Sequence, residues 1–263
     1  MEKNADSDQQ HYSIAGILNL TASEPYFLFN FLAFFSYIPI RFAASSLLSP
    51  HFTSHLLHRE IQAFLAFCIF AAVKMVKEET WEAFIADTLF YAEVFLVAIA
   101  LVLDYHLAIW YMLSFLVMYI FTQQPPYLSL GTSNQLTPLQ LETILTEGRT
   151  SKFWLVEFRA LSSSNCIRTS RLFPELSITF SNKNLSFGTV DIGLFPNVAP
   201  KFGISLGNSK QLPTYILFEN AEEVARFPEF NLEAKASIPV VTKKLLCRHF
   251  ELDKRLLDYV NGK

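Results

Sequence analysis

Apolar residues are concentrated in the first half of the chain, in four long runs separated by short polar segments. The runs extend from Tyr26 to Ile40 with a continuation past Arg41 to Leu48, from Ile61 to Val76, from Phe84 to Leu103, and from Leu107 to Thr122. A helix needs about 20 residues, or about 17 at the short end, to cross a bilayer. By this measure the last two runs qualify as membrane spans and the first two are marginal.

Two carboxylates interrupt the third run. Asp87 can sit at the membrane interface, whereas Glu93 lies deeper, where a charged side chain would cost about 2.5–3.5 kcal/mol. Either Glu93 makes a polar contact inside a helix bundle, or the span begins further along the chain. The second interpretation is favoured because the length of a span is variable.

The pattern changes after Thr122. Residues 123–138 contain Pro125 and Pro126, followed by Gly131, Thr132, Ser133 and Asn134, and are typical of a linker. The remaining residues predict helices at 139–147, 165–180, 197–202 and 239–259, and strands at 152–158, 187–191, 213–218 and 223–227. This order predicts an α/β domain over residues 139–263, in which parallel strands joined by helices end in an antiparallel hairpin.

Composition supports a membrane protein, with 51% hydrophobic and only 17% charged residues against about 25% charged in ordinary globular domains. The polar tail, residues 1–24, lacks the basic segment leading directly into an apolar core that marks a cleavable signal peptide. We therefore expect a retained anchor, with a cleaved leader as the alternative, and a membrane region over residues 25–122 with three to four transmembrane helices. The distribution of Lys and Arg leans towards a cytosolic α/β domain.

The strongest candidate for chemistry follows the first predicted strand, where Ser163-Ser164-Asn165-Cys166 begins a helix. A helix N-terminus lowers the pKa of a thiol placed there, and a second thiol one turn later resolves a mixed disulfide. Ser163 occupies the first of these positions, and no histidine or lysine in the segment can activate its hydroxyl. We therefore interpret Ser163 as a helix N-cap and Cys166 as a candidate redox thiol without an intramolecular partner.

This segment resembles the active-site turn of the thioredoxin fold, with Ser163 in place of the first cysteine of Cys-x-x-Cys. Residues 188–192 are similar to the next strand of that fold, and 212–214 to its cis-proline loop, which presents backbone groups to an extended substrate. Together with the apolar N-terminal half, Ser-x-x-Cys is most similar to the thioredoxin-related transmembrane protein 2 family. The resemblance covers about residues 141–263.

The resemblance implies a thioredoxin-like fold, a central mixed sheet flanked by helices, preceded by an α-helical transmembrane region. It gives Glu157 the place of the buried acid that assists proton transfer, while the accompanying basic position falls on Thr189. It implies a cis peptide bond before Pro213. The implied binding surface consists of Ser164, Asn165, Leu212, Pro213 and Thr214.

Three functions remain open on these residues. The first is a membrane-anchored thioredoxin-like protein that lacks the dithiol pair, is not an active dithiol oxidoreductase or isomerase, and binds partner proteins. The second is a monothiol disulfide-exchange protein using Cys166, and the third is a scaffold whose soluble domain only tethers. The family implies the endoplasmic reticulum membrane, crossed once or several times, and a role in redox homeostasis or protein folding. The expected partners are the lipid bilayer and protein partners or thiol-containing clients, without nucleic acid or a cofactor.

A second candidate site comprises His51, His55 and His58, whose spacing would place all three imidazoles on one face of a helix, as zinc sites require. They lie in a short connection between apolar runs, and no cysteine or carboxylate beyond Glu60 is placed to complete a ligand set. We therefore expect no metal and interpret the three histidines as interfacial residues.

Overall fold

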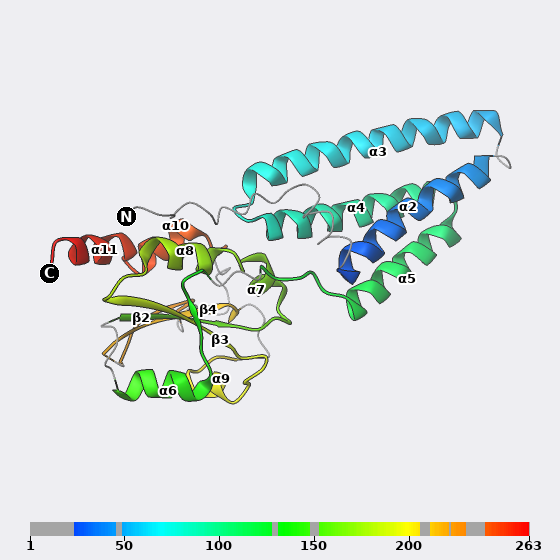
Figure 1. The fold of residues 1–263 in the computed structure, drawn as a ribbon. Helices are drawn as coiled ribbons and strands as arrows, with labels where there is room; N and C mark the ends of the chain where they lie inside the picture. Colours follow the sequence, from blue (N-terminus) through cyan, green and yellow to red (C-terminus); the bar gives the residue numbers. More distant parts are fainter. Residues whose placement is uncertain are drawn as a thin grey trace, which may run out of the picture. The chain divides into compact units, whose positions relative to one another are not determined.

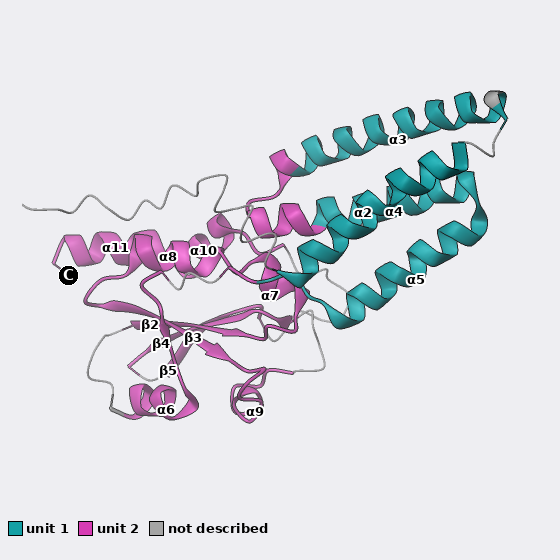
Figure 2. Ribbon diagram, turned by 45° about the vertical axis from the view of Figure 1, so that its right-hand side comes forward, with its two compact units in different colours: residues 1–74, 87–125 teal, residues 75–86, 126–263 magenta. Residues whose placement is uncertain are grey.

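The protein is described by a computed structural model that covers residues 24–45, 49–127, 131–147, 153–205, 211–220, 222–229 and 240–262. The chain forms two compact units (Figure 2). One takes the chain up to Lys74 together with Asp87–Pro125, and the other takes Met75–Ala86 together with Pro126 onward. The polar tail expected over residues 1–24 lies, but for Glu24, outside the described residues.

Most of the first unit consists of four apolar helices, α2 (Pro25–Ser45), α3 (Pro50–Lys77), α4 (Trp81–Leu103) and α5 (Tyr105–Phe121). The first three are long and apolar enough to cross a bilayer, whereas α5 has 17 residues. The expectation that the first two runs were the marginal ones was therefore wrong. Polar residues such as Arg41 and Glu60 interrupt the apolar pattern, but they do not interrupt the helical backbone.

Four charged side chains within these helices form two ion pairs. Arg41 Nε and the Tyr37 hydroxyl both donate to Glu60 Oε1, at 2.7 and 2.6 Å. At the other end of α3, Lys74 Nζ lies 2.6 Å from Asp87 Oδ2 of α4. Pairing lowers the cost of placing such charges at membrane depth.

Glu93 lies in the interior of α4, where its side chain is half-buried. The helix begins at Trp81, upstream of the apolar run that starts at Phe84. The carboxylate is close enough to Tyr26 of α2 to interact with its hydroxyl electrostatically.

The second unit contains a five-stranded sheet with the order β1-β3-β2-β4-β5. The strands are β1 (Asn134–Gln135), β2 (Phe153–Arg159), β3 (Leu185–Asp191), β4 (Thr214–Glu219) and β5 (Glu222–Phe227). The pairs β1–β3 and β2–β3 are parallel, whereas β2–β4 and β4–β5 are antiparallel. This mixed sheet with a final antiparallel hairpin confirms the predicted thioredoxin-like fold.

Helices cover both faces of the sheet (Figure 1). One face carries α6 (Pro138–Glu147) and α9 (Val198–Lys201), and the other carries α8 (Leu172–Phe180), α10 (Lys243–His249) and α11 (Leu252–Val260). Because side chains alternate along a strand, Val156 and Phe158 of β2 pack in the cluster beneath α6 and α9. Leu155 of the same strand packs in the cluster beneath α8, α10 and α11.

Two of the predicted helices are interrupted. The helix expected over 165–180 is split into α7 (Ser164–Arg168) and α8. Pro174 thereby falls in the first turn of α8, where its missing N–H removes no helical hydrogen bond. The helix expected over 239–259 is split into α10 and α11 at Glu251, whose φ of 51° lies in the left-handed region.

Part of the segment expected to be a linker is structured. Asn134–Gln135 form β1, which pairs with Gly188 and Thr189 of β3, and Leu136 is buried. A Cβ on Gly188 would lie 2.5 Å from Leu136 Cδ1. The glycine therefore makes room for a leucine that anchors the start of the domain to the sheet.

Candidate functional site

The turn at Ser163 begins where β2 leaves the sheet. Ser163 is the N-cap of α7, with φ −91° and ψ 121°. Its N–H donates to the Ala160 carbonyl at 3.0 Å, and its carbonyl accepts from the Ile167 N–H at 3.2 Å. Among the described residues, the buried Ser163 hydroxyl has no hydrogen-bond partner, so the serine holds the cap position without the side-chain bond expected of a cap.

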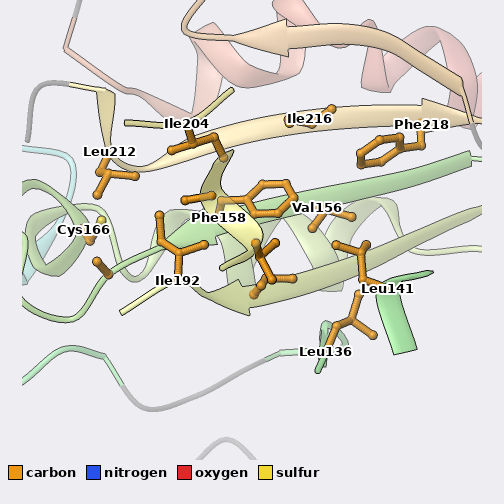
Figure 3. Close-up of a cluster of buried hydrophobic side chains, with 14 of the residues drawn as sticks. Leu136, Leu141, Val156, Phe158, Cys166, Ile192, Ile204, Leu212, Ile216 and Phe218 are labelled. Atoms are coloured by element: carbon orange, nitrogen blue, oxygen red, sulfur yellow. The ribbon is translucent and has the colours of Figure 1, made fainter. Parts of the chain in front are cut away.

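Cys166 faces the interior of the domain. Its side chain is 3% exposed and belongs to the apolar cluster that also contains Leu212 and Ile192 (Figure 3). Burial raises the pKa of the thiol to about 11, although the Ala160 backbone and the nearby Ser163 hydroxyl act in the opposite direction. Near neutral pH only about one molecule in ten thousand would carry the reactive thiolate.

The two residues between Ser163 and Cys166 are Ser164 and Asn165, and both are exposed. They form the outward surface of the turn, while Ser163 and Cys166 form its inward surface. A bound molecule can therefore reach the two central residues directly and the thiol only after a local movement.

The loop Leu212–Pro213–Thr214 lies beside this turn, because β4 runs antiparallel to β2 and Thr214 pairs with Phe158. The Leu212–Pro213 peptide bond is cis, which confirms that expectation. Leu212 shares an apolar cluster with Cys166 (Figure 3). All three residues of the loop are buried, so the exposed surface at this site comes mainly from Ser164 and Asn165.

Glu157 lies on β2 and is fully buried. Burial raises the pKa of its carboxyl to about 7, although the Arg159 guanidinium and the Tyr215 hydroxyl act in the opposite direction. Thr189, the residue at the expected basic position, pairs directly with Glu157 across the β2–β3 ladder. The positive charge beside this acid comes instead from Arg159, two residues further along the same strand.

Tyr215 belongs to the site but was not expected from the sequence. It pairs with Glu157 across the β2–β4 ladder and is fully buried. Burial, and then the neighbouring Glu157 and Cys166, raise the pKa of its hydroxyl well above the usual value. The hydroxyl has no hydrogen-bond partner of ordinary geometry within the described part of the chain. The position of Tyr215, two residues after Pro213, was the available signal, but using it required the strand register.

The other candidate groups lie outside this site. All three cysteines are free, with Cys68 exposed on α3 and Cys247 partly buried on α10. His51, His55 and His58 are exposed on α3. Across the described residues, no three His, Cys, Asp or Glu side chains are grouped so that they could hold a metal ion.

No protein-family model matches the chain. Thioredoxin-related transmembrane protein 2 of Xenopus tropicalis is 28% identical over 252 residues, which cover 92% of this chain and 86% of that protein. The protein of the same name from Xenopus laevis is 30% identical over 202 residues, which cover 76% of this chain and 69% of that protein. The homolog from Caenorhabditis elegans is 30% identical over 193 residues, which cover 72% of this chain and 70% of that protein.

Two solved thioredoxins are also similar. A thioredoxin of Nicotiana alata is 19% identical with a TM-score of 0.34, and the match covers 52% of this chain and 96% of that one. A thioredoxin of Malassezia sympodialis is 17% identical with a TM-score of 0.35, and the match covers 49% and 95%.

Proposed function

The chain belongs to the thioredoxin-related transmembrane protein 2 family, and from this premise we propose that it is a membrane-anchored protein that binds partner proteins without dithiol catalysis. Its binding surface comprises the Ser163–Cys166 turn and the Leu212–Thr214 loop. Family resemblance supports a place in the endoplasmic reticulum membrane, in redox homeostasis or protein folding. The observation that carries the proposal is the buried Cys166, with its raised thiol pKa and a serine three residues before it.

A dithiol enzyme attacks through a thiolate at the first position of the motif, and Ser163 cannot supply one. Monothiol exchange through Cys166 needs a thiol that is both exposed and substantially ionised. Burial in the apolar cluster opposes both conditions. Binding requires neither of them, since it uses the exposed surface at Ser164 and Asn165.

Two exposed leucines adjoin the turn and favour a polypeptide ligand. Leu161 is 41% exposed and Leu194 is 66% exposed. The loops that carry them are neighbours, since a Cβ on Gly193 would lie 3.7 Å from the Ala160 Cβ. Large exposed apolar side chains beside the turn suit an extended segment that buries alternate side chains against them.

The absence of dithiol catalysis is tested with the full chain in lipid nanodiscs. We expect no insulin reduction above background, because the attacking thiolate is missing. The variant Ser163→Cys should form a 163–166 disulfide yet remain a weak reductase, because Cys166 is still buried and its thiol pKa is still raised. Wild-type turnover comparable to that of a Cys-x-x-Cys protein would contradict the proposal.

Binding is tested in intact membranes with a photoreactive amino acid at Ser164. Crosslinking to partner proteins should fall in a Leu161→Arg and Leu194→Arg double variant and persist in Leu257→Arg, a control for an equally exposed leucine on α11. Cys166→Ala should preserve the crosslinks. If it abolishes them, exchange through the Cys166 thiol is the better account of the site.

A further inference from the structure

The connection between α3 and α4 belongs to the same compact unit as the sheet (Figure 2). We call residues 78–82 the acidic connection, because three of its five residues are glutamates. Each of its polar side chains contacts a helix that adjoins or follows the Ser163–Cys166 turn.

The first contact is with the end of α7. Thr80 Oγ1 donates to the carbonyl of Arg168, the last residue of α7, at 2.6 Å. Carbonyls of the last turn lack helical partners, so the threonine satisfies one that the helix cannot. Arg168 Nη2 also lies 3.7 Å from Glu78 Oε2. The helix that carries Cys166 therefore ends on the acidic connection.

The second contact is with the start of α8. Arg171 Nη2 lies 3.3 Å from Glu82 Oε1, and both side chains are largely shielded from water. The Arg171 guanidinium also stacks on the ring of Tyr127, 4.6 Å from its centre, and the Tyr127 N–H donates to Ser170 Oγ at 2.9 Å. Arg171 thus joins the acidic connection to the segment that follows α5.

A third contact reaches α10. Glu79 Oε2 accepts a hydrogen bond from the backbone N–H of Lys243 at 2.9 Å. Lys243 is the first residue of α10, where backbone N–H groups lack helical acceptors. The acidic connection therefore fixes three helices of the unit at once.

The acidic connection also joins two helices that are each long and apolar enough to cross a membrane. It follows Lys77, the last residue of α3, and includes Trp81, the first residue of α4, whose exposed side chain is typical of a membrane interface. The five residues of α7 span only about 7.5 Å from Ser164 to Arg168. The turn at Ser164 is therefore separated only by this short helix from Arg168, which binds Thr80, the residue that precedes Trp81.

We propose that the acidic connection holds the Ser163–Cys166 turn at the membrane surface, where it receives an extended juxtamembrane segment of another membrane protein. This inference rests on the proposed binding function and names the class of partner. The exposed Leu161 and Leu194 suit such a segment, because polypeptide leaving a bilayer retains apolar side chains near the interface.

Depth is measured on the full chain in vesicles containing headgroup-nitroxide lipid, with the native cysteines replaced and a fluorophore on Ser164→Cys. The matched control is Asn220→Cys, at the opposite end of the six-residue strand β4 and about 20 Å away along it. We expect strong quenching at residue 164 and little at residue 220. Equal quenching at both positions would overturn the proposal.

A charge exchange tests whether the acidic connection causes this placement. Glu82→Arg or Arg171→Glu alone leaves a partly buried charge facing a like charge and should reduce quenching at residue 164. The double variant restores an opposite-charge pair and should recover the quenching, as a coupled pair requires. Single variants that quench as strongly as the parent would overturn the role of the acidic connection.

The class of partner is tested with a photoreactive peptide of alternating valine and threonine, either palmitoylated and vesicle-bound or acetylated and free. The vesicle-bound form should crosslink near Leu161 and Leu194. The crosslinking yield should fall about five-fold in Glu82→Arg, because the effective concentration of the peptide at the turn is lower, and it should recover in the double variant. The free form should crosslink weakly in all three proteins. A free peptide that crosslinks as well as the bound form would overturn the inference.

These outcomes separate the two proposals. If residue 164 is quenched but neither peptide crosslinks, the binding function fails and the partner class fails with it. If both peptides crosslink but residue 164 is not quenched, the binding function stands and only the membrane placement is overturned.

Discussion

At the scale of single residues, Cys166 combines burial with a neighbouring acid, and both raise the pKa of its thiol. We expect alkylation of Cys166 in the folded protein at pH 7.5 to be at least about 100-fold slower than that of a short peptide thiol, because the ionised fraction is smaller by that factor. Mass spectrometry of the Cys166 peptide measures the rate, which should rise with pH up to about 11. Urea-unfolded protein is the control, and a folded rate equal to it would contradict the prediction.

Glu157 makes stability depend on pH. Its carboxyl has a pKa of about 7 in the folded protein against a usual 4.5, so between these values the native state holds more protons than the unfolded state. Stability therefore falls as pH rises through this window, and the loss is complete above about pH 7. Glu157→Gln, neutral throughout, should exceed the wild type at pH 8 by up to about 3 kcal/mol and match it near pH 4.

The measurement is urea unfolding followed by fluorescence of the buried Trp154, with Trp81 and Trp110 replaced by phenylalanine. The wild-type midpoint should drop between pH 4.5 and pH 7, the two carboxyl pKa values, and the Gln variant should show a smaller drop. If the Gln variant is more stable than the wild type by the same amount at pH 4 and at pH 8, the charge of Glu157 is not the cause of the difference.

At the scale of elements, Gly131 joins the segment before β1 to α8. It has a φ of 60°, and a Cβ there would lie 2.5 Å from the Pro174 carbonyl oxygen and 2.6 Å from Ser177 Oγ. Gly131→Ala should therefore lower stability by about 2 kcal/mol or more, since backbone strain and a clash with backbone add. Gly262→Ala is the matched control, because its φ is 68° but nothing lies within 4 Å.

The stability of both glycine variants is measured by urea unfolding, followed by the fluorescence of Trp154 as for the Glu157 variant. The Gly262 variant should lose about 1–2 kcal/mol at most, the strain contribution alone. Equal losses at the two positions would show that packing of residue 131 against α8 contributes nothing.

The sequence was sufficient to predict four of the five strands, because apolar residues dominate β2 and β4, and to predict the loop at Pro213 and the acid at Glu157. It did not predict β1, whose two residues are both polar. Tyr215 could be placed only after β4 was paired with β2. The contact between Thr80 and Arg168 joins residues 88 positions apart. Nothing in the composition of the acidic connection distinguishes it from an ordinary polar turn between two membrane helices.

At the scale of the whole molecule, the acidic connection and the segment after α5 belong to one unit, so they must lie on the same side of the membrane. We predict that α4 and α5 both cross the bilayer, although α5 has only 17 residues. Single cysteines at Lys77 and Asn261 should react together with a membrane-impermeant maleimide, and one at Tyr105 should react only from the other side. If residues 77 and 261 were labelled from opposite sides, one of the two helices would not cross the membrane.

The division of the unit between two stretches of chain, Met75–Ala86 and Pro126 onward, has a consequence for biosynthesis. The first stretch leaves the ribosome long before the sheet, and at 5–20 residues per second it precedes the C-terminal helices by about ten seconds or more. If α5 failed to insert, the nascent sheet would emerge on the wrong face of the bilayer, and Arg168 and Arg171 could never reach the glutamates. The contacts of Arg168 and Arg171 with the glutamates can therefore form only after correct membrane insertion.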